Sequence, residues 1–252
     1  MVTRIYAVGD IHGHLTRLQD IHQRIATDQA QHGDHDAPVI HVGDLVDRGP
    51  DSKGVIDHLI NGIANGENWT VLKGNHDRLL QKFVEDIDWC DPVLRPDYTW
   101  LHPRMGGWTT LNSYGVEGPP DMPLPRLQAL VRQNLPQAHH RFLADMPLYH
   151  QTDKVLFVHA GIRPGIPLAD QTEDDLIWIR QAFHDYMEPF EPFEALIIHG
   201  HTVIDAVTHY GNRINIDTGA AYGHDLSAIV IEGGQVWILD PEGRRALPNP
   251  AG

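Results

Sequence analysis

The amino-acid sequence predicts an α/β protein in which a mostly parallel sheet carries helices between its strands. Two observations lead to this fold class. Short apolar runs rich in β-forming residues alternate with stretches in which apolar residues recur at helical spacing. Several of these runs are followed directly by glycine or by a residue that can bind metal, as expected where strands of an open α/β sheet end at a functional crevice.

The predicted elements follow one another in a repeated order. Strands are expected at 4–8, 38–42 and 69–73, and each is followed by a helical pattern of apolar residues. Two later runs, 154–158 and 195–198, again end next to histidine and glycine. Residues 208–220 and 226–239 then change character and predict hairpins, with Gly-Asn and Gly-Gly as turn pairs. Strands that alternate with helices imply right-handed crossovers.

The length of 252 residues suits one large domain, so we expect a single catalytic domain over 1–252. Residues 86–136 are rich in proline, glycine and tryptophan and have no clear periodicity. We interpret this segment as an insertion between strands, of the kind that often forms a lid or a binding loop.

Composition excludes several classes of protein. A formal charge of −15 with only 19 lysines and arginines argues against an extended nucleic-acid surface, which needs clustered positive charge. The first strand begins at Arg4, which leaves no room for a leader, and no apolar stretch reaches the length of a membrane span. The single cysteine, Cys90, fits a reducing compartment. We therefore expect a cytoplasmic protein that binds neither nucleic acid nor membrane; its oligomeric state is left open.

Five motifs carry the candidate chemistry, and all five follow predicted strands. They are GDIHG (9–13), GDLVDRG (43–49), GNHD (74–77), HAG (159–161) and HGHT (199–202). Asp10 and His12 lie two positions apart, so an extended strand end would point both to one side. Asp44 has two carboxylate oxygens and could bridge two cations. Asn75, His159 and His201 would complete a mixed nitrogen and oxygen ligand set, which suits first-row divalent ions better than calcium.

Neutral ligands would leave this centre electrophilic. Two divalent cations, two aspartates and one hydroxide sum to one positive charge, and an aspartate in place of Asn75 would cancel it. Two ions about 3.5 to 4 Å apart can lower the pKa of a shared water and hold both oxygens of an in-line displacement.

The five motifs in this order resemble the phosphoprotein phosphatase family of calcineurin-like metallophosphoesterases, and most closely its bacterial and bacteriophage branch. The resemblance extends from residue 9 to 219. It implies a central β-sandwich of mixed sheets flanked by helices, and two divalent metal ions, with manganese expected and iron or zinc as alternatives. It assigns Asp10, His12 and Asp44 to one metal, and Asp44, Asn75, His159 and His201 to the other.

The same resemblance assigns further residues to the reaction. His76 would be the general acid that protonates the departing oxygen, and Asp47 the carboxylate partner that keeps its ring protonated. Arg48 and Arg180 would bind phosphate oxygens as bidentate forks. His199 and Asp217 are expected to support neighbouring ligands rather than to bind metal.

Three functions fit these residues. The leading hypothesis is a metal-dependent phosphomonoesterase acting on phosphoserine and phosphothreonine in proteins or on small phosphoesters, by attack of the metal-bridging hydroxide. The second is a dinucleoside-polyphosphate hydrolase resembling bacterial diadenosine tetraphosphatases, which tend to lack an acid at the position of Asp47. The third is a non-catalytic scaffold, which a complete ligand set argues against.

Overall fold

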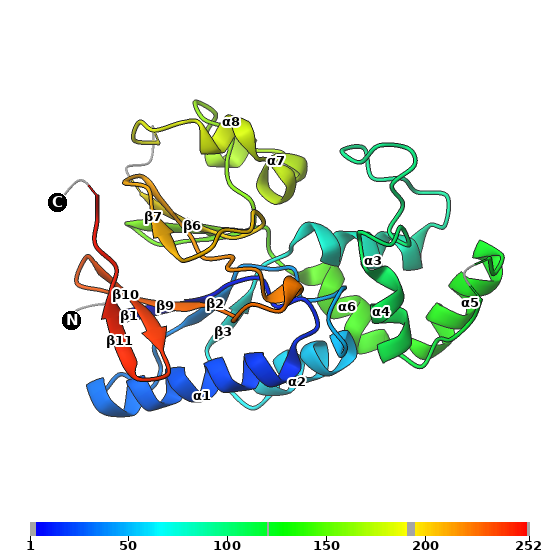
Figure 1. Ribbon diagram of the computed structural model, residues 1–252, viewed down its shortest axis with the longest axis horizontal. Helices are drawn as coiled ribbons and strands as arrows, with labels where there is room; N and C mark the ends of the chain where they lie inside the picture. Colours follow the sequence, from blue (N-terminus) through cyan, green and yellow to red (C-terminus); the bar gives the residue numbers. More distant parts are fainter. Residues whose placement is uncertain (1–3, 120, 191–194, 251–252) are drawn as a thin grey trace.

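The computed structural model describes residues 4–119, 121–190 and 195–250. Two mixed β-sheets lie face to face, and helices cover their outer surfaces (Figure 1). Helices α1 and α2 lie along one outer face, and α7 and α8 along the other. The sequence prediction of a β-sandwich of mixed sheets flanked by helices is therefore confirmed.

The first sheet has the strand order β11-β10-β9-β1-β2-β3. Its strands are β1 (Arg4–Val8), β2 (Val39–His41), β3 (Trp69–Val71), β9 (Ala228–Glu232), β10 (Gln235–Asp240) and β11 (Gly243–Ala246). Strands β1, β2 and β3 are parallel and joined by helices α1 (Leu15–His32) and α2 (Ser52–Ala64). Their carboxyl ends therefore meet at one edge of the sheet, as the alternation of strands and helices predicts.

The second sheet has the order β4-β5-β6-β8-β7. Its strands are β4 (Tyr149–Gln151), β5 (Val155–Val158), β6 (Leu196–His199), β7 (Thr208–His209) and β8 (Arg213–Asn215). Strands β5, β6 and β8 are parallel, and the outer two are antiparallel to their neighbours. The 3₁₀ helix η1 (Leu168–Asp170) and helices α7 (Glu173–Trp178) and α8 (Gln181–His184) lie between β5 and β6.

Strand β1 shows how side-chain alternation builds two cores. Ile5 and Ala7 face the second sheet and pack with residues such as Phe157 of β5. Tyr6 and Val8 face the opposite way and pack with apolar residues of α1 and α2. A strand buried on both faces reads as a continuous apolar run, which explains why 4–8 shows no polar alternation.

Both predicted hairpins are present. Strands β9 and β10 pair Glu232 with Gln235 across Gly233 and Gly234, which both have positive φ. Strands β7 and β8 pair Thr208 with Asn215. The sequence did not indicate the edge strands β4 and β11, neither of which contains a buried residue.

The segment 86–136 is more regular than its composition suggests. It contains helices α4 (Gly107–Ser113) and α5 (Leu124–Asn134), and it lies between α3 (Asn75–Glu85) and α6 (Gln137–Asp145). Trp100, Leu111 and Tyr114 are buried in the same core as α1 and α2. This insertion therefore packs against the helices that cover the first sheet and is part of their hydrophobic core.

Candidate metal centre

The loops that follow β1, β2, β3, β5 and β6 converge at one place and bring the predicted ligands together. All six predicted ligands are buried: Asp10, His12, Asp44, Asn75, His159 and His201. Two groups of possible donor atoms occur among the described residues, and the atoms of each group lie within 4.8 Å of one another. One comprises His12, Asp44 and His76, and the other Asp44, His159 and His201. Asp44 belongs to both groups, as a bridging carboxylate should.

Close contact between neighbouring loops sets the position of Asp44. A Cβ atom on Gly74 would lie 2.2 Å from Asp44 Oδ1 and 2.3 Å from its backbone nitrogen. Only glycine allows the loop after β3 to approach this near. The N–H of His76 then donates to Asp44 Oδ1 at 3.0 Å. Gly74, which precedes the predicted ligand Asn75, is thus required by the packing of the two loops.

Hydrogen bonds to backbone carbonyls orient two of the imidazoles. His12 Nδ1 lies 2.8 Å from the carbonyl oxygen of Val46, and His159 Nδ1 lies 2.8 Å from that of Val42. Each Nδ1 therefore carries the proton, and each Nε2 presents a lone pair 3.4 Å from an oxygen of Asp44. His201 Nε2 is buried without a hydrogen-bond partner among the described residues. This set of nitrogen and oxygen donors fits divalent first-row ions.

Burial and mutual interaction set the charges of the ligands. Burial lowers the pKa of His12, His159 and His201, so these rings are neutral, the form that binds metal. Burial raises the pKa of Asp10 well above its usual value, and the nearby carboxylates Asp217 and Asp44 raise it further. Such clustered carboxylates are poorly compensated by protein groups alone, which is the electrostatic condition that attracts cations.

Asn75 and Asp10 each contact a histidine of the second donor group. Asn75 Oδ1 lies 3.1 Å from His159 Nε2, so the amide oxygen faces the second donor group. Asp10 accepts the N–H of His201 at 3.0 Å. A Cβ atom on Gly200 would lie 2.0 Å from Asp10 Oδ1, so this glycine too is required by close approach.

The expectation that Asp10 and His12 share one side of an extended strand is wrong. Strand β1 ends at Val8, and His12 has a left-handed φ of 44°. The chain turns instead, and Asp10 is not a member of either group of donor atoms. The turn is held by the N–H groups of Ile11 and His12, which both donate to the carbonyl of Asp44. Asp10 nevertheless lies close to the centre, because it accepts the backbone N–H of His201.

Left-handed backbone is concentrated at the site. Six non-glycine residues among those described have positive φ, and five of them are predicted site residues: His12, Asp44, Asp47, Arg48 and His201, with φ between 44° and 74°. Such conformations are disfavoured for residues with a Cβ atom and persist where surrounding structure imposes them.

His76 and Asp47 form the predicted pair. His76 Nδ1 lies 2.6 Å from Asp47 Oδ2, and both side chains are buried. Asp47 also accepts the indole N–H of Trp100 at 3.0 Å and the hydroxyl of Thr110 at 2.7 Å. The insertion 86–136 therefore supplies two donors that fix the carboxylate, a role that its sequence did not reveal.

The two predicted arginines contact different residues of the centre. Arg48 Nη1 is 2.7 Å from His12 Nε2, and Nη2 is 2.9 Å from His76 Nε2. Arg180 is exposed and donates to Thr202 Oγ1, one residue beyond His201. Burial of the guanidinium group lowers the pKa of Arg180, and the nearby carboxylates Asp44 and Asp10 oppose that shift, so the group lies at the rim of the centre.

Asp77 is a site residue that the sequence analysis did not single out. Its carboxylate accepts the N–H groups of Asp44, Leu45 and Gly74 at 2.8 to 2.9 Å, so it ties the loops after β2 and β3 together. Its signal was its place in GNHD, at the third residue of α3, where a carboxylate favours a helix N-terminus.

His199 and Asp217 lie beside the centre and belong to neither donor group. The ring of His199 is buried against Phe183 and bonds the carbonyl of Gly200. Asp217 accepts the N–H of Gly219, and burial raises its pKa to about 6. That both residues support neighbouring ligands stays a prediction.

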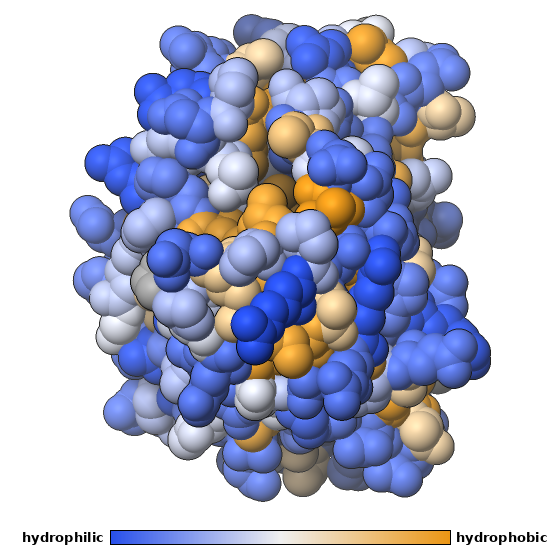
Figure 2. Space-filling view, turned by 90° about the vertical axis from the view of Figure 1, so that its right-hand side faces the viewer, coloured by the Kyte–Doolittle hydropathy of each residue, from blue (hydrophilic) through white to orange (hydrophobic). Residues whose placement is uncertain are grey.

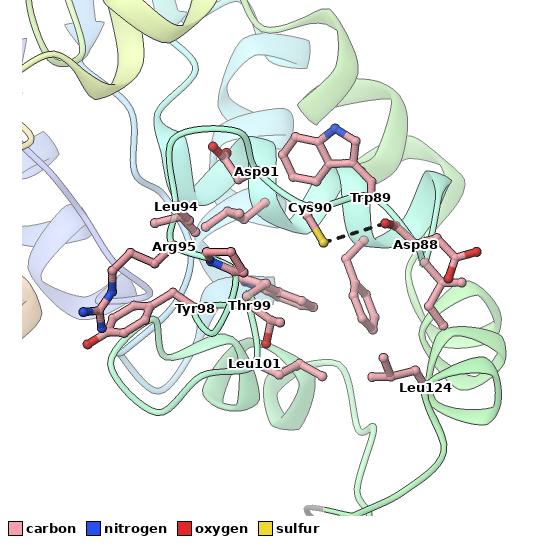
Figure 3. A pocket seen from close by; sticks show the side chains of 15 residues that line it. Asp88, Trp89, Cys90, Asp91, Leu94, Arg95, Tyr98, Thr99, Leu101 and Leu124 are labelled. Atoms are coloured by element: carbon pink, nitrogen blue, oxygen red, sulfur yellow. Dashed lines mark hydrogen bonds between the residues drawn. The ribbon is translucent and has the colours of Figure 1, made fainter.

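A cavity of about 290 Å³ lies under the insertion, between residues 79–101 and Leu124 (Figure 3). Its walls are largely apolar and aromatic. On the side of the molecule that carries α5, apolar residues also gather near the middle of a mostly hydrophilic surface (Figure 2). Trp100 lines the cavity and separates it from Asp47.

Comparison with known proteins places this chain among phosphoesterases. The family described as calcineurin-like phosphoesterase matches residues 3–231. A bis(5′-nucleosyl)-tetraphosphatase PrpE (asymmetrical) from Bacillus thuringiensis is 25% identical over 243 residues, which cover 88% of each chain. The protein of that name from Bacillus cereus is 26% identical over 241 residues with the same coverage.

Solved structures share the fold at low sequence identity. A candidate diadenosine tetraphosphatase superposes with a TM-score of 0.62 at 22% identity, covering 94% of this chain and 92% of the other. A cold-active protein-tyrosine phosphatase from a psychrophilic Shewanella gives 0.62 at 16%, covering 98% and 81%. A serine/threonine phosphatase from Saccharomyces cerevisiae gives 0.56 at 15%, covering 92% and 73%. No helix in the described part of this chain is long and apolar enough to cross a membrane.

Proposed function

This chain belongs to the calcineurin-like phosphoesterases, and from that premise we propose that it hydrolyses dinucleoside tetraphosphates such as diadenosine tetraphosphate. The observation that carries the phosphoester chemistry is Asp44, whose carboxylate belongs to both groups of donor atoms. The tetraphosphate substrate is supported by relatives of that named activity, which align over 88% of the chain. This substrate replaces the phosphoprotein as the leading hypothesis.

The proposed centre holds two divalent metal ions. Asp10, His12 and Asp44 would hold one, and Asp44, Asn75, His159 and His201 the other. Manganese is the proposed ion, with iron or zinc as alternatives. When bound, such a pair supplies Lewis acidity, activates water and neutralises the charge that develops on phosphate oxygens.

The remaining chemistry belongs to side chains. His76 donates its proton to the departing phosphate oxygen, and Asp47 holds that ring by the 2.6 Å contact with Nδ1. Arg48 presents both terminal nitrogens toward the centre, and Arg180 lies at its rim beside Thr202. Both guanidinium groups suit the non-bridging oxygens of a polyphosphate, which carries several negative charges.

A phosphomonoesterase is the second candidate, and one observation favours it. The contact between Asp47 and His76 is intact and is reinforced by Trp100 and Thr110. An acid at this position is the sequence feature that favours a protein phosphatase over a diadenosine tetraphosphatase. The two candidates share the centre and differ only in what the phosphate is attached to.

A substrate panel separates the candidates. Purified protein is stripped of metal, loaded with manganese and assayed against diadenosine tetraphosphate, a phosphoserine peptide and p-nitrophenyl phosphate. We expect the highest kcat/KM on the dinucleotide, with ATP and AMP as the products of asymmetrical cleavage. Preference for the phosphopeptide would reject the dinucleotide in favour of the monoesterase.

A further inference from the structure

Tyr222 stands beside the metal centre with an exposed aromatic ring. The guanidinium carbon of Arg48 lies 5.4 Å from the centroid of this ring. Arg48 in turn contacts His12 and His76, so one arginine separates the tyrosine from the centre. Tyr222 is 63% exposed, the largest value among the exposed large hydrophobic residues in the described part of the chain.

The loop that carries this ring is tied down. Tyr222 ends the 3₁₀ helix η2 (Ala220–Tyr222), which lies between left-handed glycines at 219 and 223. Arg17 of α1 donates to the carbonyls of Ala220 at 2.9 Å and of Gly223 at 3.0 Å, and also to that of His224. An exposed ring on a fixed loop loses little conformational entropy when a ligand packs on it.

Arg48 is fixed on its other side as well. Its N–H donates to the carbonyl of Gly106, and a Cβ atom on Gly106 would lie 2.6 Å from the Arg48 nitrogen. The arginine is therefore held between the insertion and Tyr222. A ligand whose phosphate meets Arg48 would find an aromatic surface directly beside that phosphate.

We propose that Tyr222 is a positioning residue that stacks the nucleobase of the substrate while Arg48 contacts its phosphate chain. Bases stack on aromatic side chains with little dependence on base identity. This inference rests on the proposed function, because a phosphopeptide would offer no base to stack.

The cavity under the insertion is the competing place for a base. It contains Tyr98, over which Arg95 lies at 4.5 Å (Figure 3). Trp100 forms the wall of this cavity toward the centre; it is only 4% exposed and donates its indole N–H to Asp47. A base in this cavity would be separated from Arg48 by buried side chains, whereas Tyr222 touches Arg48 directly.

The experiment measures what the nucleoside adds to binding. Diadenosine tetraphosphate hydrolysis is followed with manganese-loaded protein, and inhibition constants are determined for ATP and for inorganic tripolyphosphate. The ratio of the two constants reports the contribution of adenosine. We expect Tyr222→Ala to reduce the preference for ATP about tenfold and to raise KM for the dinucleotide, with the constant for tripolyphosphate unchanged. Tyr222→Phe and Tyr222→Trp should retain the preference.

Tyr210→Ala is the matched control. The guanidinium carbon of Arg213 lies 4.5 Å from the ring centroid of Tyr210, so this tyrosine also pairs with an arginine. Tyr210 precedes β8, whereas Asp217 follows that strand, so Tyr210 lies at the end of β8 that is far from the centre. Its preference for ATP should equal that of the unaltered protein.

Each outcome decides a different statement. Failure of the unaltered protein to hydrolyse diadenosine tetraphosphate overturns the proposed function and, with it, this inference. Turnover with an unchanged preference in Tyr222→Ala overturns the role of Tyr222 alone. Loss of the preference in Tyr98→Ala, with Tyr222→Ala unaffected, would place the base in the cavity under the insertion.

Discussion

Trp100 donates its indole N–H to both carboxylate oxygens of Asp47, at 3.0 Å each, although the two residues are 53 positions apart. The insertion is thus connected to the group that holds His76. Trp100→Phe keeps a ring in the core and removes this donor. We expect kcat to fall about tenfold with metal content unchanged, since a hydrogen bond to a charged group contributes about 1.5 to 3 kcal/mol. Steady-state kinetics measure this.

Trp89→Phe is the control for that substitution, because Trp89 lies in the same insertion and contacts Arg78 through its ring. Its kcat should match that of the unaltered protein. An equal loss of activity in both variants would show that the insertion acts through its packing rather than through the bond to Asp47.

His76→Asn tests the general acid. Asparagine cannot supply the proton that the departing oxygen needs, so kcat should fall by roughly 10² to 10⁴. Elemental analysis should find the same metal content as in the unaltered protein. Loss of both metals in this variant would make His76 a ligand, a role that its membership of the first donor group would also permit.

Asp44→Asn tests the bridging ligand. Replacing this carboxylate removes the one negative charge that the two donor groups share. We expect loss of bound metal, measured by elemental analysis after dialysis, together with loss of activity. Asp20→Asn, on the exposed side of α1, is the control and should retain both. Full metal occupancy in Asp44→Asn would reject the bridging assignment.

Arg180→Ala tests the rim arginine. Its exposed position beside Thr202 predicts a contact with substrate phosphate rather than a part in folding. We expect KM to rise about tenfold or more while the melting temperature stays constant, as removal of a charge-assisted hydrogen bond implies. Arg180→Lys should recover part of the loss, because lysine keeps the charge without the fork. An unchanged KM would leave Arg180 outside the site.

A buried ion network predicts how stability depends on pH. Asp28 of α1 accepts hydrogen bonds from Tyr6 of β1 at 2.6 Å and from Arg244 of β11 at 2.7 Å. Burial opposes ionisation of Asp28, but the bonds from Arg244 and Tyr6 outweigh it and lower its pKa. Because the folded pKa lies below the unfolded value of about 3.9, the stabilisation is complete above that pH and is lost as pH falls through the folded pKa.

Asp28→Asn should therefore lower the free energy of unfolding by about 3 kcal/mol near neutral pH, since it breaks a buried pair. The difference from the unaltered protein should shrink below about pH 4. Urea unfolding at several pH values measures both effects. A difference that stays constant down to about pH 2 would attribute the loss to packing instead of charge.

The sequence predicts much of this molecule because each local signal is repeated. The strands β1 and β2 stand out as apolar runs that are buried throughout, and the glycines before Asp44 and Asn75 mark where loops meet. The hairpin of β9 and β10 is readable from its Gly-Gly turn.

Contacts between distant segments are what the sequence could not supply. Trp100 lies in no motif, yet together with Thr110 it fixes Asp47, because the positions of both side chains depend on how the insertion folds back on the sheet. Asp77 was visible in a motif, but its three backbone partners come from two loops. The turn at His12 escaped prediction since an L-residue with positive φ has no reliable local signal.

The left-handed backbone at five site residues has a consequence for engineering. Each such residue lies about 1 kcal/mol above a relaxed conformation, and glycine would remove that penalty. Substituting glycine at Asp47 or His201 should relieve strain while deleting a reactive group. Directed evolution that selects for thermal stability alone would thus enrich variants that are more stable but inactive. Selection on this enzyme must therefore measure turnover in every round.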